Sequence, residues 1–449
     1  MERNKICCMD VLDGLKLIPD GTIQTVITSP PYWNLRDYGV PGQLGLEPTP
    51  EMYVRNMVEI FREIKRVLRP NGTVWLNLGD SYAANRGYQV PDNKHVDVGN
   101  NRGMRAKVIG LKPKDLIGLP WRVALALQAD GWWLRMDIVW SKPNPMPSSV
   151  TDRPGTSHEY IFLLAKSSRY FYDSVAVREK GVYPAGTKGG KGSQSRKRSG
   201  ANSRPEEYAT YSGTRNKRSV WSSTTGGADW DFCEACQTIF IGKDRNRIEK
   251  IKELQEDGKT KTIKKCPCGV TDRWAGHFAA YPGKLIEPCI LAGTSPYACC
   301  TCGAPWKRVV EKKRISRPEL SPEDPRYRPG KYISPYKDIN GTGDSHVTET
   351  RTIGWAPTCK CNKELQLDQI LQFQAGKVPV GLGRCIILDP FIGTGTTAMK
   401  AVEHGRDYLG IEISELYTTI ATLRVERAVE DAARKKKQGE QTKLFEGGC

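Results

Sequence analysis

The sequence predicts an α/β fold, in which helices alternate with the strands of a central sheet, and three observations support it. Gln24 to Ile27 is a short β-branched run that predicts a strand. Glu51 to Leu68 carries apolar residues at helical spacing and leads through a Pro-Asn-Gly turn into a second strand-like run, Thr73 to Leu78. Near the C-terminus, Cys385 to Leu388 predicts a buried strand that is followed by a glycine-rich turn. This alternation is typical of a sheet whose strands are connected by helices.

The remaining elements continue the pattern. An acidic turn at Asp10 precedes a short helix that carries Val11, Leu12 and Leu15. We expect further helices over 120–129, 284–291 and 397–404, strands over 132–140, 158–164 and 406–411, and a C-terminal helix carrying Tyr417, Ile420 and Leu423. Residues 82–104 and 188–218 are rich in Gly and polar residues and are expected to be loops or linkers.

The stretch Thr-Ser-Pro-Pro-Tyr-Trp follows the first strand. Neither proline can donate to a sheet, so the chain leaves the sheet edge here. Ser29 offers a hydroxyl and Pro30 and Pro31 offer carbonyls as acceptors, while Tyr32 and Trp33 offer flat faces. Such a set can stack on a planar ring and accept the hydrogens of an exocyclic amino group. A simple proline turn at the end of a strand is the alternative.

A glycine-rich turn, Gly393-x-Gly395-x-x-Ala, lies between a predicted strand and a predicted helix. Its glycines permit positive φ and close backbone approach, and the helix N-terminus favours an anion. Glu412 ends the next strand, where an acid would bind ribose hydroxyls. The pattern suits NAD or S-adenosylmethionine. The Asp-Pro pair before the turn is atypical of NAD sites and favours S-adenosylmethionine.

The charge balance indicates a polyanionic partner. The 449 residues include 68 Lys and Arg against 50 acidic residues, a formal charge of +18. Nucleic acid is the simplest such partner, and a merely soluble basic protein is the alternative. Because no apolar run approaches the ~18–20 residues of a membrane span and the N-terminus shows no secretory signal, we expect a cytoplasmic protein without membrane contact.

Fourteen cysteines in a chain without an export signal favour metal binding over disulfides. Eight of them form four close pairs, which combine into two four-thiolate candidates: Cys233, Cys236, Cys266 and Cys268, and then Cys299, Cys302, Cys359 and Cys361. Cys300 competes as a ligand at the second site. Four thiolates close the coordination shell, so the expected zinc is structural rather than catalytic. Reduced, unligated thiols are the alternative.

Together, these residues resemble the amino-group DNA methyltransferases, which methylate cytosine N4 or adenine N6. The stretch from Thr28 to Trp33 is similar to their catalytic motif, and Asp389-Pro390-Phe391-x-Gly393-x-Gly395 is similar to their cofactor motif. Asp10 is similar to the acid that contacts the cofactor adenine. The catalytic motif comes before the cofactor motif in this chain, which resembles the permuted β group of the family.

The resemblance implies a Rossmann-like sheet that binds S-adenosylmethionine, with a circularly permuted motif order, an inserted target-recognition region and zinc-ribbon-like elements. The expected parts are a catalytic part of the core (1–180), a target-recognition region with the first cysteine cluster (181–273), a return to the core (274–298), a zinc-ribbon-like insert (299–361), a cofactor-binding part (362–430) and a basic tail (431–449).

The function that the resemblance implies is methyl transfer from S-adenosylmethionine to the N4 amino group of a cytosine flipped out of duplex DNA. Ser29 favours cytosine, because family members that act on adenine more often have Asp or Asn at this position. Adenine N6, an RNA substrate, and a zinc-ribbon DNA-binding protein with an inactive core remain as alternatives. A restriction endonuclease counterpart is compatible with the resemblance, and the residues do not indicate an oligomeric state.

Overall fold

The computed structural model describes residues 2–35, 37, 39–83, 111–112, 114–145, 147–148, 150–181, 214–225, 230–254, 260–271, 274, 281–316, 346–361, 366, 368–370, 372 and 382–446. Most of the expected loops 82–104 and 188–218 therefore lie outside the described residues. The chain forms two compact units. The first comprises Met1–Tyr172, Ser219–Pro296 and Arg384–Cys449, and the second comprises Asp173–Arg218 and Tyr297–Gly383.

An eight-stranded mixed sheet forms the centre of the first unit, in the order β1-β16-β15-β2-β3-β5-β4-β8. Strands β1, β16, β15, β2 and β3 run parallel, β5 is antiparallel to β3 and β4, and β8 is parallel to β4. The strands span Lys5–Cys8 (β1), Asp407–Glu412 (β16), Ile386–Asp389 (β15), Ile23–Thr28 (β2), Leu68–Leu78 (β3), His158–Ala165 (β5), Trp133–Ser141 (β4) and Val220–Ser222 (β8).

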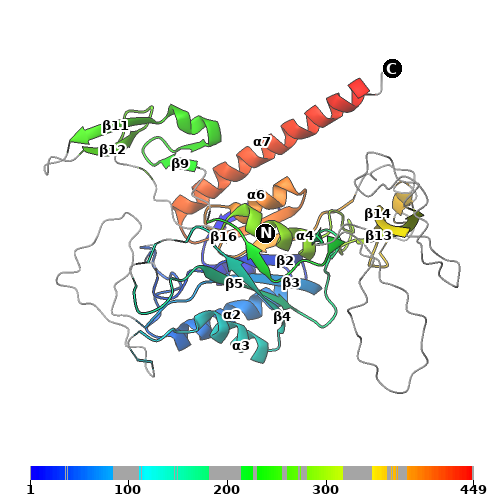
Figure 1. The fold of residues 1–449 in the computed structure, drawn as a ribbon, viewed down its shortest axis with the longest axis horizontal. Helices are drawn as coiled ribbons and strands as arrows, with labels where there is room; N and C mark the ends of the chain where they lie inside the picture. The colour runs from blue at the N-terminus through cyan, green and yellow to red at the C-terminus, as the bar shows by residue number, and fades with distance from the viewer. Residues whose placement is uncertain are drawn as a thin grey trace, which may run out of the picture. The chain divides into compact units, whose positions relative to one another are not determined.

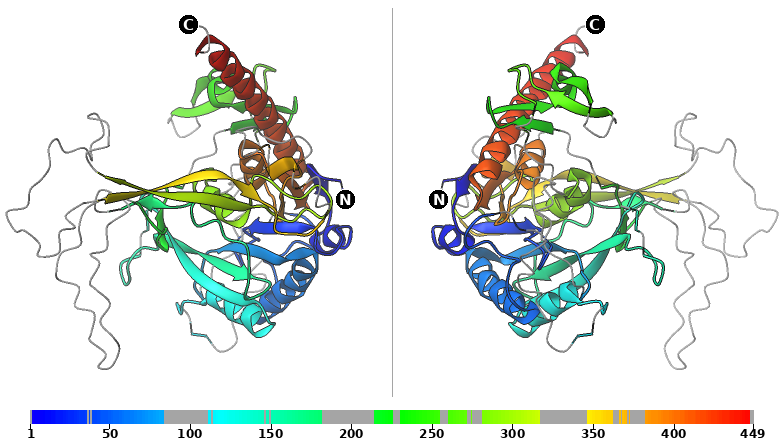
Figure 2. Two further views of the ribbon diagram at one scale, coloured as in Figure 1. Left: turned by 90° about the vertical axis from the view of Figure 1, so that its right-hand side faces the viewer. Right: turned by 90° about the vertical axis from the view of Figure 1, so that its left-hand side faces the viewer.

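Helices cover both faces of this sheet (Figures 1 and 2). One face carries α1 (Val11–Lys16), α2 (Pro50–Val67) and α3 (Leu119–Ala129), and the other carries α4 (Gly283–Gly293) and α6 (Thr396–Glu403). The long helix α7 (Glu415–Glu446) packs on α6 and then extends away from the sheet. The expected α/β architecture, with its alternating helices and strands, is confirmed.

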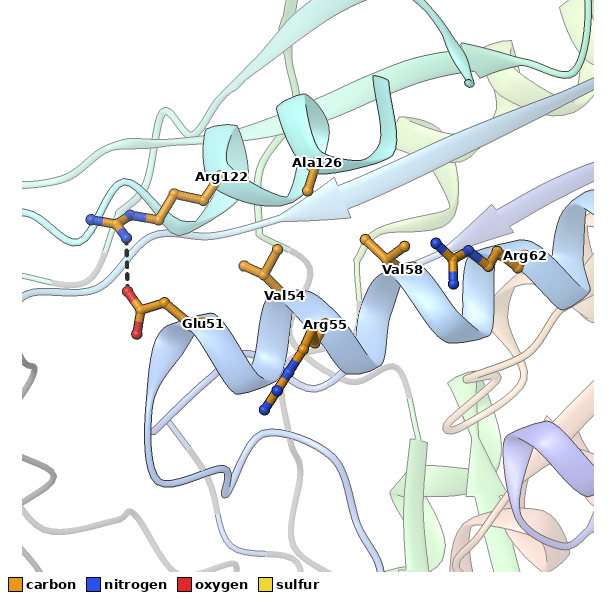
Figure 3. A pocket seen from close by; sticks show the side chains of 7 residues that line it. All are labelled: Glu51, Val54, Arg55, Val58, Arg62, Arg122 and Ala126. Carbon is orange, nitrogen blue, oxygen red and sulfur yellow. Dashed lines mark hydrogen bonds and ion pairs between the residues drawn. The ribbon is translucent and has the colours of Figure 1, made fainter. Parts of the chain in front are cut away.

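Helix α2 shows how local sequence sets one of these layers. The Thr49 hydroxyl accepts the Met52 amide at 3.2 Å, and Pro50 opens the first turn. One face buries Tyr53, Met57, Ile60, Phe61, Ile64 and Val67, each contributing roughly 1.5–3 kcal/mol. The other face meets α3 across a shallow groove, where Glu51 pairs with Arg122 at 3.0 Å (Figure 3). None of the predicted site residues lines this groove.

Two element boundaries differ from the sequence-based expectation. The turn expected at 69–72 is part of β3, because the register shifts between the pairs Ile23↔Leu68 and Thr25↔Thr73 and the extra residues are accommodated as a bulge. Helix α7 continues to Glu446, so residues 431–446 of the expected basic tail are helical. At 69–72, pairing with the distant strand β2 overrides the local turn signal of Pro-Asn-Gly.

The first cysteine pairs belong to a small substructure of the first unit. It contains β9 (Trp230–Cys233), β10 (Thr238–Ile241), the 3-10 turn η1 (Gly242–Arg247), β11 (Glu249–Leu254) and β12 (Thr260–Lys265). Asp231, buried on β9, pairs with Arg245 at 2.6 Å and with Lys264 of β12. We call residues 230–274 the first cysteine module.

Within its described residues, the second unit contains two antiparallel ribbons. Strands β6 (Glu179–Lys180) and β7 (Thr214–Arg215) form one, and β13 (Lys307–Ser316) and β14 (His346–Ala356) form the other. At the base of the longer ribbon, Arg308 donates two hydrogen bonds to Asp173 Oδ2, at 2.8 and 3.0 Å, and its guanidinium lies over the Trp355 ring. The expected target-recognition region 181–273 is thus divided between the two units.

Candidate active site and cysteine centres

The predicted site residues meet at the carboxyl edge of the parallel strands. Asp10 follows β1, Glu412 ends β16, and Asp389 ends β15. Ser29 follows β2. In open α/β sheets, ligands bind outside this edge. The pairing of β15 with β2 therefore brings residues from the two ends of the chain to one place.

Asp389 lies at the centre of a buried hydrogen-bond network. Its Oδ1 accepts the Thr28 hydroxyl at 2.8 Å and the Phe391 amide at 3.2 Å. Its Oδ2 accepts the Tyr281 hydroxyl at 2.7 Å and the Thr397 hydroxyl at 2.6 Å. Burial raises the pKa of Asp389 above its ordinary value, and these four donors oppose the shift. One carboxylate thus joins the end of β2, the glycine turn and the segment before α4.

The glycine turn has the backbone that its sequence predicts. Gly393 and Gly395 have φ values of 52° and 84°, in the left-handed region that favours glycine. Glu412 accepts the Gly393 amide at 2.9 Å and the Ser414 amide at 3.0 Å, and its burial raises its pKa. Asp10 accepts the Leu12 amide at 2.8 Å and caps α1. Pro390 and Phe391 connect β15 to this turn.

The serine-proline stretch is the start of a directed hydrogen-bond chain. Ser29 donates to the Tyr32 hydroxyl at 3.3 Å, and Tyr32 donates to Glu159 Oε2 at 2.7 Å. Lys142 pairs with the other oxygen of Glu159. Burial and the nearby Glu159 raise the pKa of Tyr32 well above its ordinary value, so Tyr32 keeps its proton. The chain therefore runs from Ser29 toward an ion-paired carboxylate.

Two further contacts fix this stretch in place. The Tyr53 hydroxyl of α2 donates to the Pro31 carbonyl at 2.9 Å. A Cβ atom on Gly79 would lie 2.6 Å from Cε2 of the Tyr32 ring, so only glycine fits beside this ring in the present arrangement. The second motif proline is held through its carbonyl, and Tyr32 is held by packing as well as hydrogen bonding.

The stacking role expected for Trp33 is wrong in this structure. Trp33 is 1% exposed, packs in the main hydrophobic core and donates its Nε1–H to the Glu47 carbonyl at 2.8 Å. Because Leu35 lies on the surface only two residues later, the chain turns sharply enough to point Trp33 inward. An aromatic ring next to a site motif can serve the core, and only the tertiary structure distinguishes the two roles.

Both predicted cysteine quartets are brought together. In each, the four sulfur atoms lie within 4.8 Å of one another. In the first, Cys233 and Cys268 are 3.7 Å apart and Cys236 and Cys266 are 3.6 Å apart. A tetrahedral ion with sulfur bonds of ~2.3 Å would set sulfur atoms ~3.8 Å apart, so the geometry fits zinc. The second quartet excludes Cys300, which is exposed.

The comparisons with known proteins agree with this geometry. A family model described as "DNA methylase" matches residues 23–300 and 384–423, which is more than half of the chain. The chain belongs to the DNA methylase family. Its members covered by this model act on amino groups, as the resemblance implied. The unmatched stretch 301–383 belongs to the second unit.

Curated relatives of this chain are named as type II methyltransferases, and a solved DNA methyltransferase also aligns with it. The chain is 41% identical over 291 residues to the type II methyltransferase M.XycI of Xanthomonas campestris pv. cyanopsidis, covering 64% of this chain and 71% of that protein. It is 47% identical over 182 residues to M.SmaI of Serratia marcescens, covering 40% and 62%. The solved PvuII DNA methyltransferase (cytosine-N4-specific) aligns at 14% identity and a TM-score of 0.45, over 97% of this chain and 93% of that chain.

Lys142, Glu159 and Tyr281 lie in stretches that also resemble the family, 140–147, 158–160 and 277–282, but the sequence alone assigned these three residues no role. Glu159 and Lys142 lie within or after apolar strands, and Tyr281 precedes α4. A charged residue inside an otherwise apolar strand was the available signal for Glu159, but its partners come from other strands. Within the described part of the chain, no helix is both long and apolar enough to span a lipid bilayer.

The Asp389 network leads to a stability prediction. Tyr281→Phe and Thr28→Val each remove one donor from a buried carboxylate, so each should lower the free energy of unfolding by ~1.5–3 kcal/mol. Because both donors serve one carboxylate, the double variant should deviate from additivity. Urea unfolding measures all three. Tyr172→Phe, at a half-exposed position, is the control and should change little; equal stability of Tyr281→Phe and wild type would contradict the role of the network.

Proposed function

We propose that this DNA methylase transfers a methyl group from S-adenosylmethionine to the N4 amino group of a cytosine flipped out of duplex DNA. The observation that carries the proposal is the parallel pairing of β2 with β15, which brings the Ser29-Pro30 stretch and the glycine turn to the same edge of the sheet. A target base must leave the helix stack to reach acceptors at such an edge. The motif order supports a circular permutation, with the reacting side coming first in the chain.

The cofactor would be held by the second half of this edge. The Gly393–Gly395 turn offers close backbone approach, Glu412 offers acceptors for ribose hydroxyls, and Asp10 lies at the end of the neighbouring strand for the adenine. When bound, S-adenosylmethionine supplies an electrophilic sulfonium methyl group. Each oxygen of Asp389 accepts from two protein donors, whereas each oxygen of Glu412 accepts from one, so we assign Asp389 the positioning of this turn rather than direct cofactor contact.

The hydrogen-bond chain supports a specific role for Ser29. Because Ser29 donates its proton to Tyr32, the lone pairs of its oxygen remain to accept a hydrogen of the target amino group. The Pro30 carbonyl is the second acceptor, since the Pro31 carbonyl already accepts Tyr53. Two acceptors draw the nitrogen toward tetrahedral geometry and free its lone pair for attack. Catalysis here depends on positioning and electrostatics.

Glu159 is the last acceptor of the hydrogen-bond chain from Ser29, and it would receive the proton that the reaction releases. Its carboxylate accepts from Tyr32 and is neutralised by Lys142. After methyl transfer the amino nitrogen carries an acidic proton, which Ser29 Oγ can accept while its own proton passes to Tyr32 and on toward Glu159. The serine at the first motif position favours cytosine through the family resemblance, because family members that act on adenine more often have Asp or Asn at this position.

The inserted parts would serve DNA recognition and stability. We propose that residues 181–273 select the target sequence, because this stretch is basic and lies between the two motifs. We also propose structural zinc at both cysteine quartets, since polar inserts of this kind cannot bury enough apolar surface to hold themselves together. The names of the relatives support a type II modification role with a cognate restriction endonuclease.

Product analysis tests the proposed reaction. DNA methylated by the enzyme should yield N4-methylcytosine after digestion to nucleosides, as measured by mass spectrometry. Ser29→Ala should lower turnover by ~10²–10³-fold, because it removes one preorganised polar contact, and leave cofactor affinity intact. N6-methyladenine as the sole product would overturn the assignment to cytosine and keep the enzyme class.

The raised pKa of Glu412 predicts how cofactor affinity depends on pH. Ribose hydroxyls need the ionised carboxylate, so affinity should be complete above the raised pKa and fall as the pH drops through it. This loss should begin at higher pH than the ~4.3 of an ordinary glutamate. Calorimetry across pH measures the profile. Glu412→Gln should bind weakly and without this pH dependence, whereas exposed Glu415→Gln should behave as wild type.

Zinc content is predicted at about two ions per chain from the two quartets. Elemental analysis of protein purified without added metal measures it. Cys361→Ser should remove one ion, and Cys300→Ser, the exposed neighbour outside the quartet, should remove none. A stably folded protein without metal would mean that these cysteines are ordinary thiols.

Exchange of residues 181–273 with the corresponding segment of a related methylase should move the methylated sequence. Methylome sequencing of cells that express the chimera reports the new site. A parallel exchange of 303–358 is the control, and transfer of specificity with that insert would overturn the assignment of the target-recognition region.

A further inference from the structure

Helix α7 contacts the first cysteine module along one side. Near its start, four residues of α7 pack against four residues of β9 and β10: Leu416, Tyr417, Ile420 and Leu423 against Trp230, Phe232, Ile239 and Ile241. Trp230, Phe232 and Ile420 are at most 2% exposed, so this is a closed apolar contact. Figure 1 shows α7 starting beside α6 and β16 and passing the strands of this module.

The same turns of α7 also contact the glycine turn. A Cβ atom on Gly395 would lie 3.0 Å from Cβ of Ala421, so the helix packs directly on this glycine. Arg424 donates from Nη1 to the Thr394 carbonyl at 2.5 Å and to the Thr394 hydroxyl at 2.9 Å. Thr394 is the residue between the two glycines, and both it and Arg424 are nearly fully buried.

Arg424 joins these two contacts. Its guanidinium lies over the Trp230 ring, 5.8 Å from the centroid, while it holds the Thr394 carbonyl. Trp230 opens β9, and Cys233, a member of the first quartet, ends it. A buried guanidinium needs such partners, since leaving it unsatisfied is costly. The path from the quartet to the glycine turn is therefore β9, Trp230, Arg424 and Thr394.

We propose that Arg424 is a positioning residue that couples the first cysteine quartet to the cofactor turn, so that metal in the quartet tightens S-adenosylmethionine binding. Metal in the quartet fixes β9 and β10, which keeps Trp230 against Arg424. Arg424 then holds the Thr394 carbonyl and with it the positive-φ conformations of Gly393 and Gly395. This proposal rests on the proposed function. Arg424 lies one residue beyond the stretch that the family model matches.

Calorimetric titration with S-adenosylmethionine tests the residue. Arg424→Met keeps much of the side-chain volume and removes the charge-assisted hydrogen bonds, so affinity should fall ~10–100-fold. Turnover at saturating cofactor and the KM for DNA should stay near those of wild type, since the reacting groups are untouched. Arg424→Lys, which keeps a charge and a donor, should recover part of the affinity.

The control is Arg434→Gln, an exposed arginine farther along the same helix whose ion pairs with described residues, Asp431 at 2.7 Å and Glu430 at 3.9 Å, lie within α7. It should bind the cofactor as wild type does. If wild type binds the cofactor and Arg424→Met binds it equally well, the coupling is wrong while the proposed function stands. Failure of wild type to bind S-adenosylmethionine would instead remove the proposed function.

A double-mutant cycle tests whether metal in the first quartet acts through Arg424. Cys236→Ser, with loss of one ion verified by elemental analysis, should weaken cofactor binding in the wild-type background and have little further effect in Arg424→Met. Independent, additive losses would contradict the coupling.

Trp230→Leu tests the path in a protein with its quartet intact. This variant keeps apolar packing against Ile420 and removes the ring face, so a several-fold loss of cofactor affinity is expected. Unchanged affinity in this variant would contradict the path through Trp230.

Discussion

The carboxylate of Asp389 is the contact on which the arrangement of the site depends. It receives hydrogen bonds from Thr28, Tyr281 and Thr397 and from the backbone of Phe391. A buried carboxylate is costly unless such donors surround it, so the donors and the carboxylate hold one another in place. Since these donors come from three separate stretches of the chain, one side chain holds the end of β2 against the glycine turn.

The sheet explains why two ends of a long chain can build one site. Strands β2 and β15, from opposite ends of the sequence, pair directly and in parallel, so both deliver their following loops to the same edge. Everything inserted between them can then vary in length without moving this edge. The second unit, which contains the stretch that the family model does not match, is an example of such an insertion.

The cysteine quartets lie in segments that can build only a small hydrophobic core of their own. The segments around them are rich in Lys, Glu, Gly and Pro and supply few aliphatic side chains for a core of their own. Each quartet gathers sulfur atoms from positions far apart in the chain, which closes a loop and orders its ends. In the first cysteine module, apolar side chains of β9 and β10 pack against α7, and this contact links the module to the methylase core.

Much of this protein follows from its sequence. Apolar periodicity located the main helices and strands, the two prolines and the glycines located the turns, and close cysteine pairs located the quartets, because each of these signals is local. The tertiary structure alone decided which partners meet. It assigned Trp33 to the core, connected Ser29 through Tyr32 to Glu159, and surrounded Asp389 with donors. It also put Arg424 between a tryptophan and a glycine turn. These contacts join residues up to several hundred positions apart, and no spacing in the sequence encodes such a distance in space.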